Sequence, residues 1–82
     1  MQFRVTRKDI KTGKKDNCQL CPVALAMKRA LGAEVQVLMG KYQFQSAAHE
    51  LPYKVTQFIK RFDDGLPVKP FSFNIPGIKK AK

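Results

Sequence analysis

The chain opens with an alternation of apolar and polar residues over positions 1–6. Phe3 and Val5 are the apolar members, and the neighbours on both sides of each are polar. This period of two predicts a half-buried β-strand. Thr6 and Asp9 then have the spacing of a capping box, with Asp in place of the usual Glu. We therefore expect one helical turn after the strand, ending near Gly13.

The next apolar pattern has the spacing of a helix. Pro22 suits the first helical position, because its missing N–H is not needed there. Gly32 suits the left-handed position just past a helix end. We therefore predict a core helix over residues 22–31. Its buried face is expected to carry Leu20, Val23, Ala24, Met27, Ala30 and Leu31.

Two further alternating runs flank a glycine. Residues 33–39 and 42–45 each alternate apolar and polar side chains, and Gly40 with Lys41 stands between them as a turn signal. This arrangement predicts a β-hairpin. Residues 46–50 are expected to be a connector, with room for one helical turn.

A second amphipathic helix is predicted to begin at Pro52 and to stop at the Asp-Asp-Gly of residues 63–65. Its apolar stripe is Leu51, Val55, Phe58, Ile59 and Phe62. Pro67 and Pro70 keep the following link extended. Residues 71–75 alternate apolar and polar side chains again, which predicts a last strand.

The predicted order is strand, helix, strand, strand, helix, strand. This is the split βαβ order of ferredoxin-like folds, so we predict one α+β domain over residues 1–76, with a four-stranded antiparallel sheet and two helices on one face. Residues 77–82 are expected to be a basic mobile tail. The alternative is a smaller α+β arrangement in which the first strand pairs elsewhere. The open sheet face is predicted to carry Gln2, Arg4, Thr6, Glu34, Gln36, Gln43, Gln45, Ser72 and Asn74.

The chain is strongly basic for its length. Its 82 residues hold 16 Lys and Arg against 6 Asp and Glu, which gives a net charge of +10. Such a field favours an anionic partner: nucleic acid, a nucleotide, an acidic protein or an anionic surface. No apolar run approaches the roughly 20 residues that span a bilayer, and the first residues lack the apolar core of a signal peptide. We therefore expect a cytoplasmic protein without membrane contact, and its small core favours a homo-oligomer.

Few residues suggest catalysis or metal binding. Cys18 and Cys21 have the spacing of a redox pair or of half a zinc site. The chain has no second such pair, so both thiols are expected to pack at the helix start. His49 is the single histidine and has no nucleophile pattern around it. Asp63 and Asp64 are better explained as a helix stop. The sequence therefore indicates a protein that is not an enzyme and needs no metal and no cofactor.

Two segments of the chain resemble a group of small accessory proteins of tailed bacteriophages. The first combines Thr-x-x-Asp-Ile-x-x-Gly at residues 6–13 with Cys-x-x-Cys-Pro-Val-Ala-Leu-Ala at residues 18–26. The second runs from Leu51-Pro52 through Phe58-Ile59 and Phe62-Asp63 to Gly-Leu-Pro-Val-Lys-Pro-Phe-Ser-Phe at residues 65–73. The resemblance implies a host-directed protein made in the infected bacterial cell. Small phage proteins of this kind often oppose bacterial defence, in one mode by sequestering a nucleotide immune signal between the subunits of an oligomer.

We therefore expect a homo-oligomer that binds a phosphorylated nucleotide signal, of the cyclic nucleotide or cyclic ADP-ribose type, rather than DNA or RNA. The side chains expected to neutralise its phosphates are Arg4, Arg29 and Lys41. Those expected to bond base or ribose edges are Gln36, Gln43 and Asn74, and Tyr42 is available for stacking. The alternatives are a basic nucleic-acid-binding protein and a direct inhibitor of a host defence factor. The nucleic-acid alternative rests on Arg7, Lys8, Lys11, Lys14, Lys15, Lys79 and Lys80.

Overall fold

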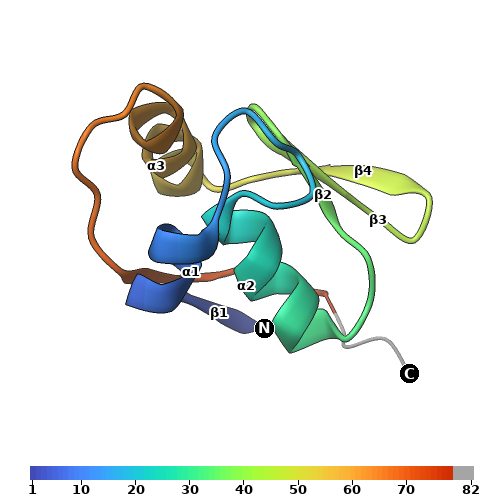
Figure 1. Cartoon of the computed structure of the whole chain (residues 1–82). Helices are drawn as coiled ribbons and strands as arrows, with labels where there is room; N and C mark the ends of the chain where they lie inside the picture. Colours follow the sequence, from blue (N-terminus) through green and yellow to red (C-terminus); the bar gives the residue numbers. More distant parts are fainter. Residues whose placement is uncertain (79–82) are drawn as a thin grey trace.

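The computed structural model of the chain describes residues 1–78, which form three helices and five strands (Figure 1). The strands are β1 (Gln2–Val5), β2 (Gln36–Leu38), β3 (Lys41–Phe44), β4 (Ala47–Glu50) and β5 (Phe71–Asn74). The helices are α1 (Arg7–Thr12), α2 (Pro22–Leu31) and α3 (Tyr53–Asp63). The part of the predicted basic tail beyond residue 78, with Lys79 and Lys80, lies outside the described residues.

The capping box predicted from Thr6 and Asp9 is confirmed at the start of α1. The Thr6 hydroxyl accepts from the backbone N–H of Asp9 at 3.1 Å, and Asp9 Oδ2 accepts from the backbone N–H of Thr6 at 2.9 Å. Gly13 ends the helix, as expected. A Cβ at Gly13 would lie 2.7 Å from the Asp9 carbonyl oxygen and 2.7 Å from Cδ of Pro22. Glycine is therefore what allows α1 to end so close to the first residue of α2.

The core helix predicted over residues 22–31 is confirmed as α2. Cys21 is its N-cap, Pro22 lies in its first turn, and Gly32 ends it in the left-handed conformation with φ of 68°. Leu20 was expected on the buried face, and that prediction is wrong. The residue lies before the cap, so it does not follow the helical spacing, and its side chain is 37% exposed.

The chain is α+β, as predicted, but its strands form two antiparallel sheets and not one four-stranded sheet. β1 pairs with β5, and β2, β3 and β4 form a separate three-stranded sheet. The backbone N–H of Val37 in β2 donates to the carbonyl of Cys18 at 2.7 Å. The loop before α2 thus lies along the outer edge of β2, and β4 pairs with the other edge of β3, which is the edge that the first strand takes in a ferredoxin-like sheet. The predicted ferredoxin-like strand pairing is therefore wrong.

β4 is a strand where we expected a connector. Gln45 and Ser46 form the two-residue turn that joins β3 to β4, and their φ angles are 54° and 63°. A turn with two positive φ angles usually carries Asn-Gly, so Gln-Ser gives no turn signal in the sequence. All four residues of β4 are exposed, so this strand has no alternation of buried and exposed side chains and no matching alternation of apolar and polar residues in the sequence. The segment therefore lacks both sequence signals of a hairpin strand, the turn residues and the alternation of apolar and polar positions.

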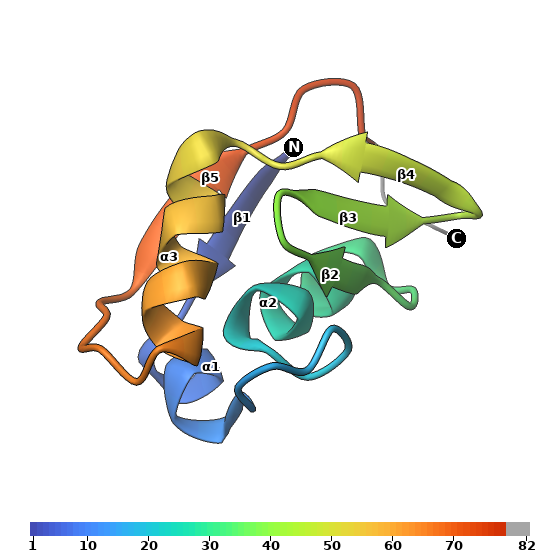
Figure 2. The same ribbon diagram turned by 90° about the horizontal axis from the view of Figure 1, so that it is seen from above.

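α2 lies at the centre of the molecule between the two sheets, with α3 beside it (Figure 2). Met27 and Leu31 of α2 are fully buried, as is Phe3 of β1. The ring of Phe3 stacks on that of Phe73 in β5, with centroids 5.2 Å apart. This packing leaves the outer face of the β1–β5 pair, where Arg4 lies opposite Ser72, open to solvent. No helix within residues 1–78 is long and apolar enough to cross a membrane.

Candidate anion-binding surface

A groove of about 460 Å³ lies between α3 and the extended segment that precedes β5. Residues 67–71 form one wall, and Pro67 and Pro70 keep that wall extended. The other wall consists of the α3 side chains Lys54, Gln57, Phe58 and Arg61. These four residues stand at i, i+3, i+4 and i+7, so they share one side of the helix. Nη2 of Arg61 donates to the carbonyl of Pro67 at 3.3 Å, which ties the two walls together.

A second groove, of about 420 Å³, lies where β1 meets α1. Pro70 and Phe71 line both grooves, so the two adjoin at these residues, and we call them together the two-groove surface. Within residues 1–78, no carboxylate lines either groove. The cationic side chains that line them come from β1, α1, α3 and the segment before β5, and they are Arg4, Arg7, Lys54, Arg61 and Lys69.

Phe71 lies at the junction of the two grooves. It is partly buried and pairs with Val5 in the β1–β5 sheet. The Phe58 ring supports it from α3, with centroids 4.7 Å apart and planes tilted by 36°. Nζ of Lys54 lies over the Phe71 ring, 5.9 Å from its centroid, within the range of a cation–π contact. The surface therefore combines an aromatic ring, held in place by packing, with an ammonium group over it.

Arg29, which we expected to bind a phosphate, is bonded to Asp9, although its side chain is 53% exposed. Its Nη1 and Nη2 donate to the two carboxylate oxygens of Asp9 at 2.8 and 2.9 Å, and Nη2 also donates to the carbonyl of Arg4 at 3.0 Å. Burial alone would raise the pKa of the Asp9 carboxyl. The hydrogen bonds from Arg29 and Thr6 outweigh burial, so this pKa lies below its usual value. The pair joins α1 to α2.

Tyr42, which we considered for stacking on a ligand, belongs to the core. Its side chain is only 3% exposed, and burial raises the pKa of its hydroxyl. Its ring stacks on that of His49, with centroids 5.2 Å apart. The ring is therefore not open to a ligand, which is a correction to the stacking role. The alternation of β3 explains this position, because it places Tyr42 and Phe44 on the buried side.

The remaining residues predicted for a nucleotide divide between the two sheets. Gln36 and Gln43 face each other in β2 and β3. Asn74 lies opposite Gln2 in the other sheet, on the strand pair that also carries Arg4. Lys41 lies at the far end of β3, opposite Glu50. A polar hollow of about 400 Å³ adjoins the glutamine pair, and its lining includes Gln19, Glu34, Gln36, Gln43, Gln45 and Ser46.

Of the cations predicted to bind nucleic acid, Arg7 lines the two-groove surface, and the four lysines that follow it in the sequence lie outside the two grooves. Lys8 and Lys11 lie on α1, and Lys14 and Lys15 lie in the loop that follows, all of them exposed. The sequence interpretation missed the cations that lie far along the chain, Lys54, Arg61 and Lys69. The sequence did contain a signal that Lys54 and Arg61 lie together on the polar side of α3, because residues seven apart share a helix face.

The two cysteines lie at the start of α2. Sγ of Cys21 accepts from the backbone N–H of Ala24 at 3.4 Å and so caps the helix. Burial raises the pKa of the Cys21 thiol, which keeps it protonated and opposes both metal binding and thiol exchange. Within residues 1–78, no group of three or more His, Cys, Asp or Glu side chains has the arrangement of a metal site.

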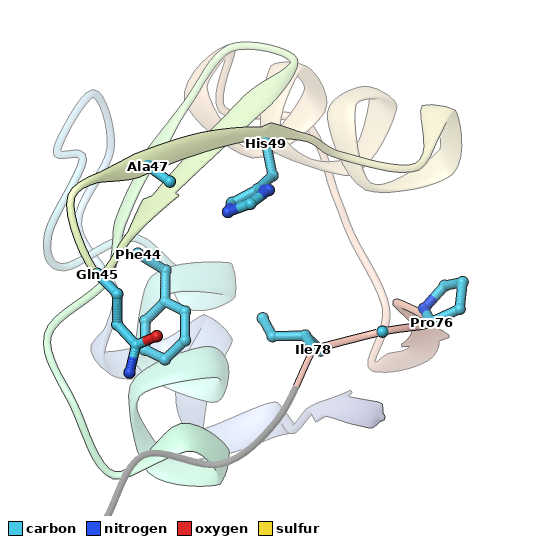
Figure 3. A pocket seen from close by; sticks show the side chains of 7 residues that line it. Phe44, Gln45, Ala47, His49, Pro76 and Ile78 are labelled. Atoms are coloured by element: carbon cyan, nitrogen blue, oxygen red, sulfur yellow. The ribbon is translucent and has the colours of Figure 1, made fainter.

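His49 lies on β4 and points into a hollow of about 510 Å³ (Figure 3). Phe44 and Ile78 line the same hollow, together with the turn at Pro76 and Gly77. Among the described residues, neither ring nitrogen of His49 hydrogen-bonds to another side chain. A general base is normally oriented by such a partner, so the geometry gives no support for acid–base chemistry at this position.

Comparison of the chain with protein-family models, with curated proteins and with solved structures finds no match in any of the three.

Proposed function

We propose that this protein is a non-enzymatic nucleic-acid-binding protein that contacts the phosphate backbone through the two-groove surface. The single observation that carries the proposal is the composition of that surface. Five cationic side chains from four parts of the chain line two adjoining grooves in which the described residues place no carboxylate. Convergent cations of this kind neutralise successive phosphates of a polyanion.

The three arginines of the surface favour phosphate in particular. An Arg fork matches two phosphate oxygens, whereas a Lys ammonium acts as a point charge. Arg4 and Arg7 come from β1 and α1, and Arg61 reaches the neighbouring groove from α3. The exposed lysines of α1 and the loop after it extend the positive field beyond the grooves, which favours a long anion over a small one.

Fluorescence anisotropy with a labelled oligonucleotide, repeated over a series of salt concentrations, tests this function. We expect the logarithm of the association constant to fall with the logarithm of salt concentration with a slope of about −3 to −4, as release of counterions from about five phosphates implies. Arg61→Ala is expected to weaken binding about tenfold. The matched control is Lys60→Ala. It removes the same charge from the residue that precedes Arg61 on α3, and Lys60 lines neither groove. Absence of binding at low salt, or equal losses in the two variants, would contradict the proposal.

A second candidate function is suggested by the polar hollow beside Gln36 and Gln43. A hollow of about 400 Å³ rimmed by amide side chains suits the hydrogen-bonding edges of a nucleobase or ribose. In an oligomer, cations of a second copy could supply the phosphate contacts that this hollow lacks. The phage-like segments then suggest a protein that sequesters a nucleotide signal of bacterial defence. Calorimetry with cyclic dinucleotides, cyclic trinucleotides and cyclic ADP-ribose isomers tests it, and absence of heat at micromolar protein would reject it.

We also propose that the protein forms homo-oligomers through the open edge of β4. Leu51 N–H donates to the carbonyl of Gly40, so the alternation of an antiparallel ladder directs the backbone groups of Ala48 and Glu50 away from β3. No lysine, proline or bulge guards this edge, and an unguarded edge can pair with a second copy. Light scattering is expected to show that Ala48→Lys gives monomers. Leu38→Lys adds the same charge on another strand and is expected to leave the mass unchanged.

A further inference from the structure

We infer that the two-groove surface selects single-stranded over double-stranded nucleic acid, because it stacks an unpaired base against Phe71. This inference rests on the proposed function and names the form of nucleic acid that the surface takes. The residues common to the two grooves, Pro70 and Phe71, are apolar, and Val68 and Phe58 add apolar surface to the groove beside α3. Phosphates alone do not require such a floor, whereas unpaired bases do, since each presents an apolar face that is hidden in a duplex.

The surroundings of Phe71 show how a base would be accommodated. Phe58 supports the ring from the protein side, and Lys54 covers it with its ammonium group 5.9 Å from the centroid. An entering base replaces Lys54 on the ring, and the long Lys side chain moves aside to the adjoining phosphate. The cation then exchanges a contact with the aromatic ring for one with an oxyanion, so no charge is left without a partner.

The shape of the surface disfavours a duplex. Insertion of a helix into the major groove needs a helix face that projects from the protein. The cationic side of α3 does not project, since residues 67–71 run along it and Arg61 is bonded to Pro67 across the gap. A duplex can therefore meet only the rim cations, while a single strand can enter and reach the apolar floor.

The test compares three probes on the full chain at one salt concentration: a single-stranded oligonucleotide of about 12 thymidines, a duplex of the same length, and inorganic polyphosphate. We expect the single strand to bind about tenfold more tightly than the duplex, the gain of roughly one stacked base. Phe71→Leu keeps the apolar volume without the aromatic face, so it is expected to remove the preference by lowering the affinity for the single strand to that for the duplex. Phe71→Tyr is expected to keep the preference.

A spectroscopic readout follows base contact directly. The chain contains no tryptophan, so Phe71→Trp introduces one reporter at the junction of the grooves. We expect its fluorescence to be quenched by the single strand and not by polyphosphate. Leu38→Trp places the reporter on a 47% exposed site of the other sheet and should respond to neither. Circular dichroism and thermal unfolding confirm that each variant is folded.

The outcomes separate the two proposals. Binding of single strand and duplex with equal affinity, or an unchanged preference in a folded Phe71→Leu variant, would overturn the stacking inference and leave the proposed function standing. Absence of binding to all three probes would overturn both. A third outcome is salt-dependent binding of all three probes that Arg61→Ala weakens, with no preference for the single strand. This outcome would overturn the stacking inference and show a surface that binds phosphates only.

Discussion

The junction of α1 with α2 and the two-groove surface use the same kind of side chain for different ends. At the junction, the guanidinium of Arg29 is bonded to both oxygens of Asp9, whose side chain is only 5% exposed. One residue earlier on α2, Lys28 lies 3.4 Å from a carboxylate oxygen of Glu34. In the two grooves, by contrast, the part of the chain that the structure describes places no carboxylate in the lining that holds the five cations. The sequence assigns all of these residues the same charge, and only their neighbours distinguish structural cations from those open to a ligand.

This comparison explains why net charge is a poor guide to the site. Arg29 was expected to hold a phosphate because it lies at the end of a helix in a basic chain. Its fork is occupied by Asp9, which the capping box at Thr6 holds in position. Cations that combine with an acid in the folded state contribute stability, whereas cations without one contribute a field that attracts anions.

The largest effect on stability is expected from Asp9→Asn. The change removes the charge that holds Arg29 and weakens the cap of α1, so we expect the free energy of unfolding to fall by about 2–3 kcal/mol. Urea unfolding followed by circular dichroism measures it. Arg61→Ala is the control from the grooves and is expected to change stability by no more than about 0.5 kcal/mol. Equal losses in the two variants would remove the distinction between the two regions.

Acid should weaken the junction in a predictable direction. Because the pKa of Asp9 is lowered in the folded state from an ordinary value of 3.8, its contribution is complete above that pH and is lost as the pH falls through and below it. We expect the urea midpoint to fall as the pH is taken from about 5 towards 2.5. The slope should be smaller in Asp9→Asn than in the parent protein. Parallel curves for the two proteins would show that Asp9 does not carry the effect.

Arginine-to-lysine substitutions compare the two regions at constant charge. Arg29→Lys loses the two-pronged contact with Asp9, so we expect it to cost about 1 kcal/mol of stability and to leave oligonucleotide binding unchanged. Arg61→Lys is expected to do the reverse, with a loss of about threefold in affinity and no loss of stability. Thermal unfolding and anisotropy on the same samples give both quantities. A loss of affinity in folded Arg29→Lys would return this residue to the binding site.

The smallest effect is expected from replacing both thiols, Cys18→Ser with Cys21→Ser. Burial of a hydroxyl at position 21 costs stability, but serine is a good N-cap, so we expect a net loss of about 1 kcal/mol or less. Binding to the oligonucleotide should be retained, because neither cysteine lines the two grooves. A folded double variant that no longer binds would show that the cysteines have a functional part.

Local signals predicted most of the elements correctly. The capping box at Thr6, the proline that begins α2 and the left-handed Gly32 act within a few residues, and each lies where the sequence placed it. Strand pairing was predicted wrongly because it depends on which edge is free. β4 takes the edge of β3 that β1 was expected to use, and it follows a turn of Gln45 and Ser46 that lacks the Asn, Asp or Gly favoured at two positive φ angles.

The candidate surface was predicted only in part, for a related reason. Arg4 and Arg7 stand among the residues singled out from the sequence, but in two different hypotheses. What joins them is Phe71, which pairs with Val5 and brings the cations of α3 beside those of β1 and α1. Residues so far apart in the chain meet through a pairing that no local pattern specifies, so the surface became visible only in the folded structure.

The pairing of β1 with β5 also sets the order in which the protein matures. It joins residues 2–5 to residues 71–74, so it closes a loop that contains nearly all of the sequence. During synthesis, α2 can cover one side of β1 early, but Phe3 and Val5 lack their partners in β5 until the segment around Phe73 leaves the ribosome, and such long-range closure is slow. Both grooves need Phe71 in place. The two-groove surface is therefore complete only when β5 has paired with β1, so under the proposed function a growing chain would acquire its binding surface together with this closure.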